Sequence, residues 1–183
     1  MKPEEFTTLS KFVAYALRHN PEHYGLKINK EGWVSVESLI EAGLKYNHNL
    51  NVSKINEIVV NCNKKRFQLS ENQSQIRAVQ GHSYQNVNLS FTKKNAPEFL
   101  YHGTITTYLP SIISTGLNKQ LRHFVHLSSD IKTATSVGMR HGELVMLKIK
   151  SREMENDGYE FNISENNVWL VSEVPSKYIE VLI

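Results

Sequence analysis

The hydrophobic periodicity of this 183-residue chain changes near residue 90, and no other feature of the sequence restricts its possible folds as strongly. Before that point, apolar residues recur at intervals of three and four, which is typical of amphipathic helices. After it, they form short runs rich in β-branched and aromatic residues, which is typical of strands. We therefore expect an α+β protein with a helical lobe over residues 1–90 and a mostly β lobe over residues 91–183.

Three helices and a hairpin are predicted in the first lobe. Polar N-caps and helix-stop residues mark the helix ends. These are Thr7 or Thr8 and Asn20-Pro21 for the first, Ser35 and Gly43 for the second, and Asn51 or Ser53 for the start of the third. Residues 66–81 then form two extended runs around a polar turn. This element order is typical of a winged helix, a common nucleic-acid-binding module.

The second lobe is predicted to contain six strand regions and two helices. A polar connector over residues 86–99 precedes most of it. The strand regions are 98–104, 124–128, 143–150, 159–164, 167–175 and 178–183, and the helices cover 108–116 and, after an Asp130 cap, 130–142. The chain shows no internal repeat.

Cationic and imidazole side chains are the candidate functional groups. Arg18-His19 and Arg140-His141 end predicted helices, and Arg66 and Arg122 each precede a strand. Each has an ordinary structural explanation, because cations stabilise helix C-termini and protect strand edges. His102, between a strand and a Gly-Thr turn, is also explained as a partly buried side chain.

Composition and motifs exclude several classes of function. There is no phosphate-binding loop, dinucleotide glycine fingerprint or nucleophile elbow. His123 and His126 lack a third ligand nearby, so no metal is expected. No apolar run is long enough for a membrane span, no signal peptide is recognisable, and Cys62 has no partner for an internal disulfide. A cytoplasmic protein is therefore expected, and its net charge of +3 is compatible with an anionic partner.

Seven ordered motifs resemble those of the RNA 2′-phosphotransferases, which use NAD. The motifs span residues 9 to 175. They are LSKFVAYALRHNPEHYGLKINKEGWVSVESLI, KKRFQL with IRAVQGHS, YHGT, GLNKQLRHFVHLS, RHGELVML and NVWLVSEVP. The resemblance implies a winged-helix-like RNA-binding lobe over residues 1–90 and an ADP-ribosyltransferase-like NAD-binding lobe over residues 91–183.

The resemblance also implies a two-step reaction. An internal RNA 2′-phosphate attacks the nicotinamide ribose of NAD, releases nicotinamide and becomes ADP-ribosylated. The adjacent 2″-hydroxyl then attacks the phosphorus, which frees RNA with a 2′-hydroxyl and yields ADP-ribose 1″,2″-cyclic phosphate. Repair of RNA after tRNA splicing is the implied setting, and no oligomer is indicated, so a monomer is favoured.

Residue by residue, the resemblance implies a catalytic group and an NAD-binding group. The catalytic group is Arg18, His19, Arg66 and Arg122. The NAD-binding group is His102, Gly103, Thr104, His126, Ser128, Arg140 and Val168. Phe124 departs from the family pattern, since many relatives have a histidine there. Guanidinium groups bind phosphate oxygens in pairs, and a histidine that titrates near neutrality suits proton transfer from the 2″-hydroxyl.

Two other functions are compatible with parts of the pattern. An ADP-ribosyltransferase acting on protein or on nucleic-acid terminal phosphates would share the second lobe. A protein-modifying enzyme usually needs a late glutamate, and Glu153 and Glu155 fit that pattern only superficially, because we interpret them as solvated charges in a turn-like run. A non-catalytic winged-helix nucleic-acid binder would explain the first lobe but leave YHGT and NVWL unexplained.

Overall fold

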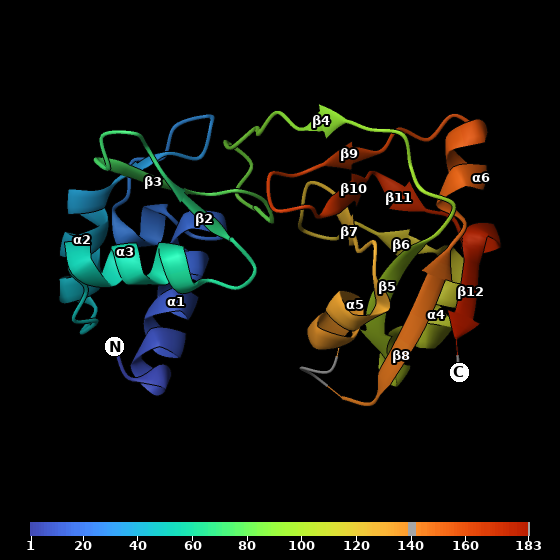
Figure 1. Ribbon diagram of the computed structural model, residues 1–183, viewed down its shortest axis with the longest axis horizontal. Coiled ribbons are helices and arrows are strands. Elements are labelled where there is room, and N and C mark those ends of the chain that lie inside the picture. The colour runs from blue at the N-terminus through green and yellow to red at the C-terminus, as the bar shows by residue number, and fades with distance from the viewer. Residues whose placement is uncertain (139–141, 183) are drawn as a thin grey trace. The chain divides into compact units, whose positions relative to one another are not determined.

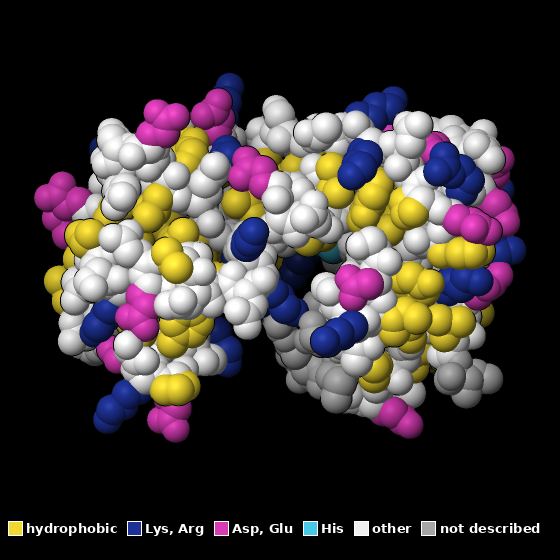
Figure 2. Space-filling model, in the orientation of Figure 1, with side chains coloured by type: hydrophobic (Ala, Val, Ile, Leu, Met, Phe, Trp, Pro, Cys, Tyr) yellow, Lys and Arg dark blue, Asp and Glu magenta, His cyan; other side chains and the backbone are white. Residues whose placement is uncertain are grey.

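The computed structural model of the protein describes residues 1–138 and 142–182. The chain forms two compact units, Met1–Ser90 and Phe91–Ile183 (Figure 1). Both units contain helices and antiparallel sheet, which confirms the predicted α+β class. On the face drawn in Figure 2, side chains of both charges are interspersed over each unit.

Unit Met1–Ser90 contains three helices and a three-stranded antiparallel sheet with strand order β1-β3-β2. Apolar side chains from the helices and the sheet form one core, in which Leu17, Leu39, Ile58 and Ile76 are fully buried. The elements are α1 (Pro3–Arg18), η1 (Glu22–Tyr24), β1 (Val34–Ser35), α2 (Val36–Lys45), α3 (Val52–Asn61), β2 (Phe67–Leu69) and β3 (Gln75–Ala78). The predicted hairpin is confirmed.

The predicted caps of the second and third helices are confirmed. The Ser35 hydroxyl accepts a hydrogen bond from the Ser38 amide at 3.3 Å, and the Asn51 side chain accepts one from the Lys54 amide at 2.9 Å. Each cap satisfies one of the amides that have no acceptor inside the helix.

The predicted N-cap of the first helix at Thr7 or Thr8 is wrong. Helix α1 begins at Pro3, where the fixed φ angle of proline suits the first helical position. The negative charges of Glu4 and Glu5 stabilise the helix, because its N-terminal end carries a partial positive charge. The Thr7 and Thr8 hydroxyls instead donate to the carbonyls of Pro3 and Glu4, at 2.9 and 3.0 Å. Both threonines therefore lie inside the helix.

Unit Phe91–Ile183 is built on short antiparallel strands. Its sheets have the orders β4-β9-β10-β7, β12-β8-β5 and β11-β6. The strands are β4 (Thr92–Lys93), β5 (Leu100–Ile105), β6 (Leu117–Asn118), β7 (Val125–Leu127), β8 (Leu144–Ile149), β9 (Asn162–Ile163), β10 (Trp169–Val171), β11 (Glu173–Val174) and β12 (Ile179–Leu182). Each of the six predicted strand regions overlaps at least one strand, whereas β4 and β6 lie outside all six.

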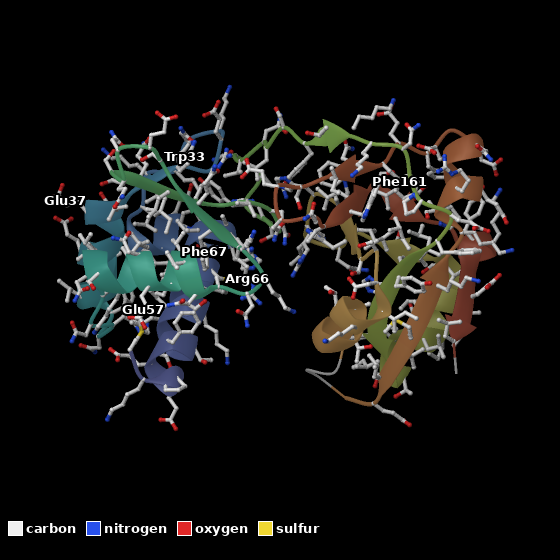
Figure 3. All side chains as sticks on the ribbon, in the orientation of Figure 1. Trp33, Glu37, Glu57, Arg66, Phe67 and Phe161 are labelled. Atoms are coloured by element: carbon white, nitrogen blue, oxygen red, sulfur yellow. The ribbon has the colours of Figure 1, made fainter. Side chains whose placement is uncertain are left out.

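Helices cover this second unit and complete its core. They are η2 (Thr106–Tyr108), α4 (Leu109–Thr115), α5 (Ile131–Gly138), α6 (Ser151–Asn156) and η3 (Ser176–Tyr178). Helix α5 packs against β5 and β8 (Figure 1), and the predicted cap is present, since Asp130 accepts a hydrogen bond from the Thr133 amide at 2.7 Å. Phe161 lies fully buried among the apolar residues of the unit (Figure 3).

Two predictions for the second unit are wrong. Residues 86–99 are more than a connector, because β4 lies within them and pairs with β9. The turn-like run around Glu153 and Glu155 is helix α6, and Glu155 is not merely a solvated charge. Its carboxylate accepts a hydrogen bond from the Ala96 amide at 3.0 Å and pairs with Arg152 at 3.2 Å, so it fastens the start of the unit to α6.

Within residues 1–138 and 142–182, no helix combines the length and the apolar character that a membrane span requires.

Gly43 provides a test of the packing between α2 and the loop after it. The sequence predicts that α2 stops at this glycine, but the helix continues to Lys45. A Cβ atom at Gly43 would lie 2.9 Å from the Leu50 Cβ, closer than real contacts allow. We expect Gly43→Ala to lower the free energy of unfolding by about 1–3 kcal/mol, measured by urea denaturation.

The control for this prediction is Glu41→Ala, at an exposed position of the same helix. It should change stability by only a few tenths of a kcal/mol. Because alanine is intrinsically a better helix former than glycine by about 1 kcal/mol, a stabilised Gly43→Ala variant would show that helix propensity outweighs the contact with Leu50.

Candidate functional site

Arg18 and His19 lie at the C-terminal end of α1, where the chain turns before Pro21. Arg18 is the last helical residue and is only 9% exposed, and the His19 amide still donates to the Tyr15 carbonyl at 3.0 Å. Carbonyl groups give this end of a helix a partial negative charge, which stabilises cations. The helix therefore presents a guanidinium and an imidazole from consecutive residues.

Residues 81–84 are hydrogen-bonded to this helix end. The Arg18 carbonyl accepts hydrogen bonds from the amides of Ser83 at 3.0 Å and Tyr84 at 3.2 Å. Gly81 has a φ of +86°, which disfavours other residues, and a Cβ atom there would touch the Arg18 guanidinium at 3.5 Å. The backbone of Gly81 thus lies directly against the Arg18 side chain.

Ser83 also contacts His19. Its hydroxyl oxygen is 2.9 Å from the His19 Nδ1 atom, a hydrogen bond between residues 64 positions apart. Sequence reasoning assigned no role to Gly81 or Ser83, although both belong to the run IRAVQGHS. The position of Gly81 and Ser83 in this motif could have indicated a role in the site. Their residue types alone do not indicate that they contact Arg18 and His19.

Arg66 directly precedes β2 and is followed by the buried Phe67 (Figure 3). Its Nη1 atom donates to the Cys62 sulfur at 3.6 Å, and its carbonyl accepts a hydrogen bond from the Val79 amide at 3.0 Å. Val79 is two residues before Gly81. The segment 79–83 therefore contacts Arg18, His19 and Arg66, three of the four predicted catalytic residues.

His102 is held on β5 by a hydrogen bond to the neighbouring strand β7. Its Nδ1 atom is 3.0 Å from the His126 carbonyl, and because a carbonyl only accepts, Nδ1 carries the proton. Burial lowers the pKa of His102 below 6.5, the bond to His126 opposes this, and the charge of Arg122 lowers the pKa further. At neutral pH the ring is therefore uncharged, and Nε2 is a hydrogen-bond acceptor.

The other predicted NAD-binding residues lie along β5, β7 and the turn before β10. Tyr101 and Ser128 exchange backbone hydrogen bonds of 2.8 and 2.9 Å, which places His102 beside His126 and Ser128. Trp169 pairs with Leu127, so the antiparallel register continues with Val168 beside Ser128. Gly103 and Thr104 continue β5, paired with Met146 and Val145. Arg140 lies outside the described residues.

Arg122 lies in the loop before β7. The residue is exposed, but protein atoms around its guanidinium desolvate the group and lower its pKa. A guanidinium nevertheless remains charged at any working pH. Phe124 packs edge-on against Phe91 with ring centroids 5.7 Å apart. An aromatic contact thus lies at the position where the family resemblance predicts a histidine.

No metal site accompanies these groups in the part of the chain that the structure describes. Over residues 1–138 and 142–182, no three His, Cys, Asp or Glu side chains are close enough together to hold an ion.

The chain matches one protein family along almost its whole length. The model of the RNA 2′-phosphotransferase, Tpt1 / KptA family matches residues 4–173. The chain belongs to this family. A probable RNA 2′-phosphotransferase of Pectobacterium atrosepticum is 46% identical, over 95% of this chain and 97% of its own. Those of Flavobacterium johnsoniae and Acaryochloris marina are 45% and 44% identical, over 94% and 96% of both chains respectively.

Membership of the RNA 2′-phosphotransferase family makes the chain a transferase, which confirms the predicted class of enzyme. The matched residues 4–173 include every predicted site residue. The roles of the individual residues stay predictions.

The lowered pKa of His102 makes stability depend on pH. Unfolding restores the ordinary pKa of His102, near 6.5. As the pH falls, the unfolded chain therefore binds a proton at His102 before the folded chain does, and acid favours unfolding. Below pH 6.5 we expect this residue to lower the free energy of unfolding by up to about 1.4 kcal/mol per pH unit. Urea denaturation of wild type and His102→Asn between pH 7.5 and 5.5 measures the difference.

Asparagine retains a side-chain donor for the His126 carbonyl but does not titrate. The loss of stability between pH 7.5 and 5.5 should therefore be smaller in the variant. Equal losses in the two proteins would show that His102 does not titrate differently on folding.

Proposed function

We propose that this chain removes an internal 2′-phosphate from RNA by transferring it to NAD, in the two steps that the family resemblance implies. The first joins the RNA phosphate to ADP-ribose and releases nicotinamide. The second yields RNA with a 2′-hydroxyl and ADP-ribose 1″,2″-cyclic phosphate. The observation that carries this proposal is the attachment of Arg18, His19 and Arg66 to one backbone segment, residues 79–83.

The first unit is proposed to bind the RNA as a winged-helix-like lobe. Its element order is helix, strand, two helices and two strands, and the hairpin of β2 and β3 would be the wing. This order and the family's activity on RNA support the proposal. Splice junctions of tRNA are one class of RNA with an internal 2′-phosphate.

The arginines are proposed to hold the RNA phosphate. A planar guanidinium binds two phosphate oxygens at once, which fixes both position and orientation. Arg18, Arg66 and Arg122 would neutralise charge as the phosphate acts first as nucleophile and then as electrophile. Both steps depend mainly on orientation and electrostatics.

His19 is proposed to act in the second step, by removing the proton of the 2″-hydroxyl or by holding that hydroxyl in line. The bond to Ser83 at 2.9 Å orients the imidazole, a condition for directed proton transfer. Ser83 would then be a positioning residue for His19.

NAD is proposed to bind the second unit as a co-substrate, in an ADP-ribosyltransferase-like lobe. The residues fit a dinucleotide, because the uncharged His102 offers Nε2 as an acceptor for a ribose hydroxyl, with His126 and Ser128 beside it. Bound NAD supplies an electrophilic ribose carbon with a neutral leaving group. Gly103, Thr104 and Val168 would border the dinucleotide.

The decisive assay incubates the protein with a short RNA that bears one internal 2′-phosphate, with and without NAD, and resolves the products by mass. We expect NAD-dependent loss of the phosphate together with ADP-ribose cyclic phosphate. Arg18→Ala, Arg66→Ala and Arg122→Ala should each lower kcat/KM on the order of a hundredfold or more, since each removes charge from the phosphate.

Two controls separate this effect from folding and from general charge. Each arginine variant should show a cooperative thermal transition. Lys11→Ala removes a positive charge at an exposed position of α1 and should retain wild-type kcat/KM. Arginine variants with wild-type rates would overturn the assignment, and NAD consumed only with protein or terminal phosphates would indicate an ADP-ribosyltransferase with another target.

The proposed role of His19 predicts a specific block. His19→Ala should accumulate the ADP-ribosylated RNA, because the second step loses its base while the anionic phosphate still performs the first. Ser83→Ala should show a weaker form of the same block. Single-turnover reactions resolved by mass measure the intermediate, and its absence from His19→Ala would argue against this role.

A further inference from the structure

Tyr15 lies on α1 one turn before His19 and is half exposed. Its ring centroid is 5.6 Å from that of the His19 imidazole, and its exposed fraction is 50%. All of residues 1–90 are described, and among the large apolar side chains exposed there, Tyr15 is aromatic while Leu44, Val52 and Val60 are aliphatic. An exposed aromatic ring thus adjoins the proposed phosphate-binding end of the helix.

Inner aromatic residues hold the Tyr15 ring in place. Tyr24 meets it edge-on, with centroids 6.4 Å apart and planes at 90°. Tyr24 is in turn fixed by edge contacts with Phe12 at 5.3 Å and Tyr46 at 4.8 Å. Phe12 is buried in the core of the unit. The ring is therefore supported on one side, although half of its surface is open to solvent.

We propose that Tyr15 stacks on the base of a nucleotide next to the 2′-phosphorylated one. This inference rests on the proposed function, because it requires the RNA phosphate to be held at Arg18 and His19. The nucleotides on either side of the phosphorylated one lie within a few ångströms of its phosphate. At this end of α1, the half-exposed Tyr15 ring offers an apolar surface to one of them. Aromatic rings bind single-stranded RNA in this way, and every base has a face to stack on.

Stacking at this position should affect binding rather than chemistry. The contact is remote from the reacting atoms, so it stabilises bound substrate and transition state equally. Such uniform binding lowers KM for the RNA and leaves kcat unchanged. Because all bases stack, Tyr15 would favour RNA with ordinary bases beside the phosphate without selecting a sequence.

The experiment compares two RNA oligonucleotides with one internal 2′-phosphate, one with bases throughout and one with abasic residues on both sides of the phosphorylated nucleotide. For the RNA with bases, Tyr15→Ala should raise KM about tenfold at unchanged kcat. Tyr15→Phe should keep the wild-type KM, whereas Tyr15→Leu, apolar but not aromatic, should resemble Tyr15→Ala. For the abasic RNA, wild type and Tyr15→Ala should have equal KM values.

Leu44→Ala is the control, since Leu44 on α2 is about as exposed as Tyr15 and should leave both KM values unchanged. An unchanged KM in Tyr15→Ala, an equal rise on both RNAs, or a rise in KM for NAD instead would overturn the inference alone. A wild-type protein that dephosphorylates neither RNA would overturn the proposed function itself. The two failures are therefore distinguishable.

Discussion

The hydrogen bonds between the end of α1 and residues 83 and 84 determine how the candidate site of the first unit is built. The last carbonyls of a helix have no partner within it, and the Arg18 carbonyl finds two in the amides of Ser83 and Tyr84. The same contact brings Ser83 to the His19 ring and Gly81 to the Arg18 guanidinium. The same segment thus provides hydrogen-bond donors for the end of α1 and brings the residues of the candidate site together.

The second unit also buries an ionisable side chain, but there burial favours the uncharged form. Arg18 is a cation kept almost entirely from solvent at the negative end of a helix. At His102, burial instead keeps the ring uncharged, and a strand carbonyl decides which nitrogen bears the proton. A permanent positive charge suits a phosphate, whereas a neutral acceptor suits a sugar hydroxyl. The two environments therefore agree with the phosphate proposed to bind at Arg18 and the ribose hydroxyl proposed to bind at His102.

Sequence patterns were sufficient where a structure is decided by neighbouring residues. The caps at Ser35 and Asn51 and six strand regions of the second unit were predicted correctly, because a cap lies three residues from its amide and an alternating run is visible locally. The two-residue strands β4 and β6 were not predicted, since they are too short to show alternation. The start of α1 was not, since Pro3 with its acidic neighbours competes with two plausible threonine caps. Helix α6 was missed because it has only six residues and a single buried apolar side chain, Met154, so it shows no hydrophobic periodicity.

In the candidate site too, features that depend on neighbouring residues were predicted, whereas contacts between distant residues were not. Charged residues can be selected from their type, and adjacent ones such as Arg18 and His19 must lie together. The contact of His102 with His126 joins residues 24 positions apart and depends on the neighbouring strands β5 and β7, which the sequence did not specify. Gly81 lies against Arg18 in a backbone conformation with positive φ, and Ser83 contacts Arg18 through its amide and His19 through its hydroxyl. The type of a residue does not show which distant residue it contacts. The residues that orient a site are therefore harder to predict than those that carry its charge, because orientation arises from pairing between distant segments.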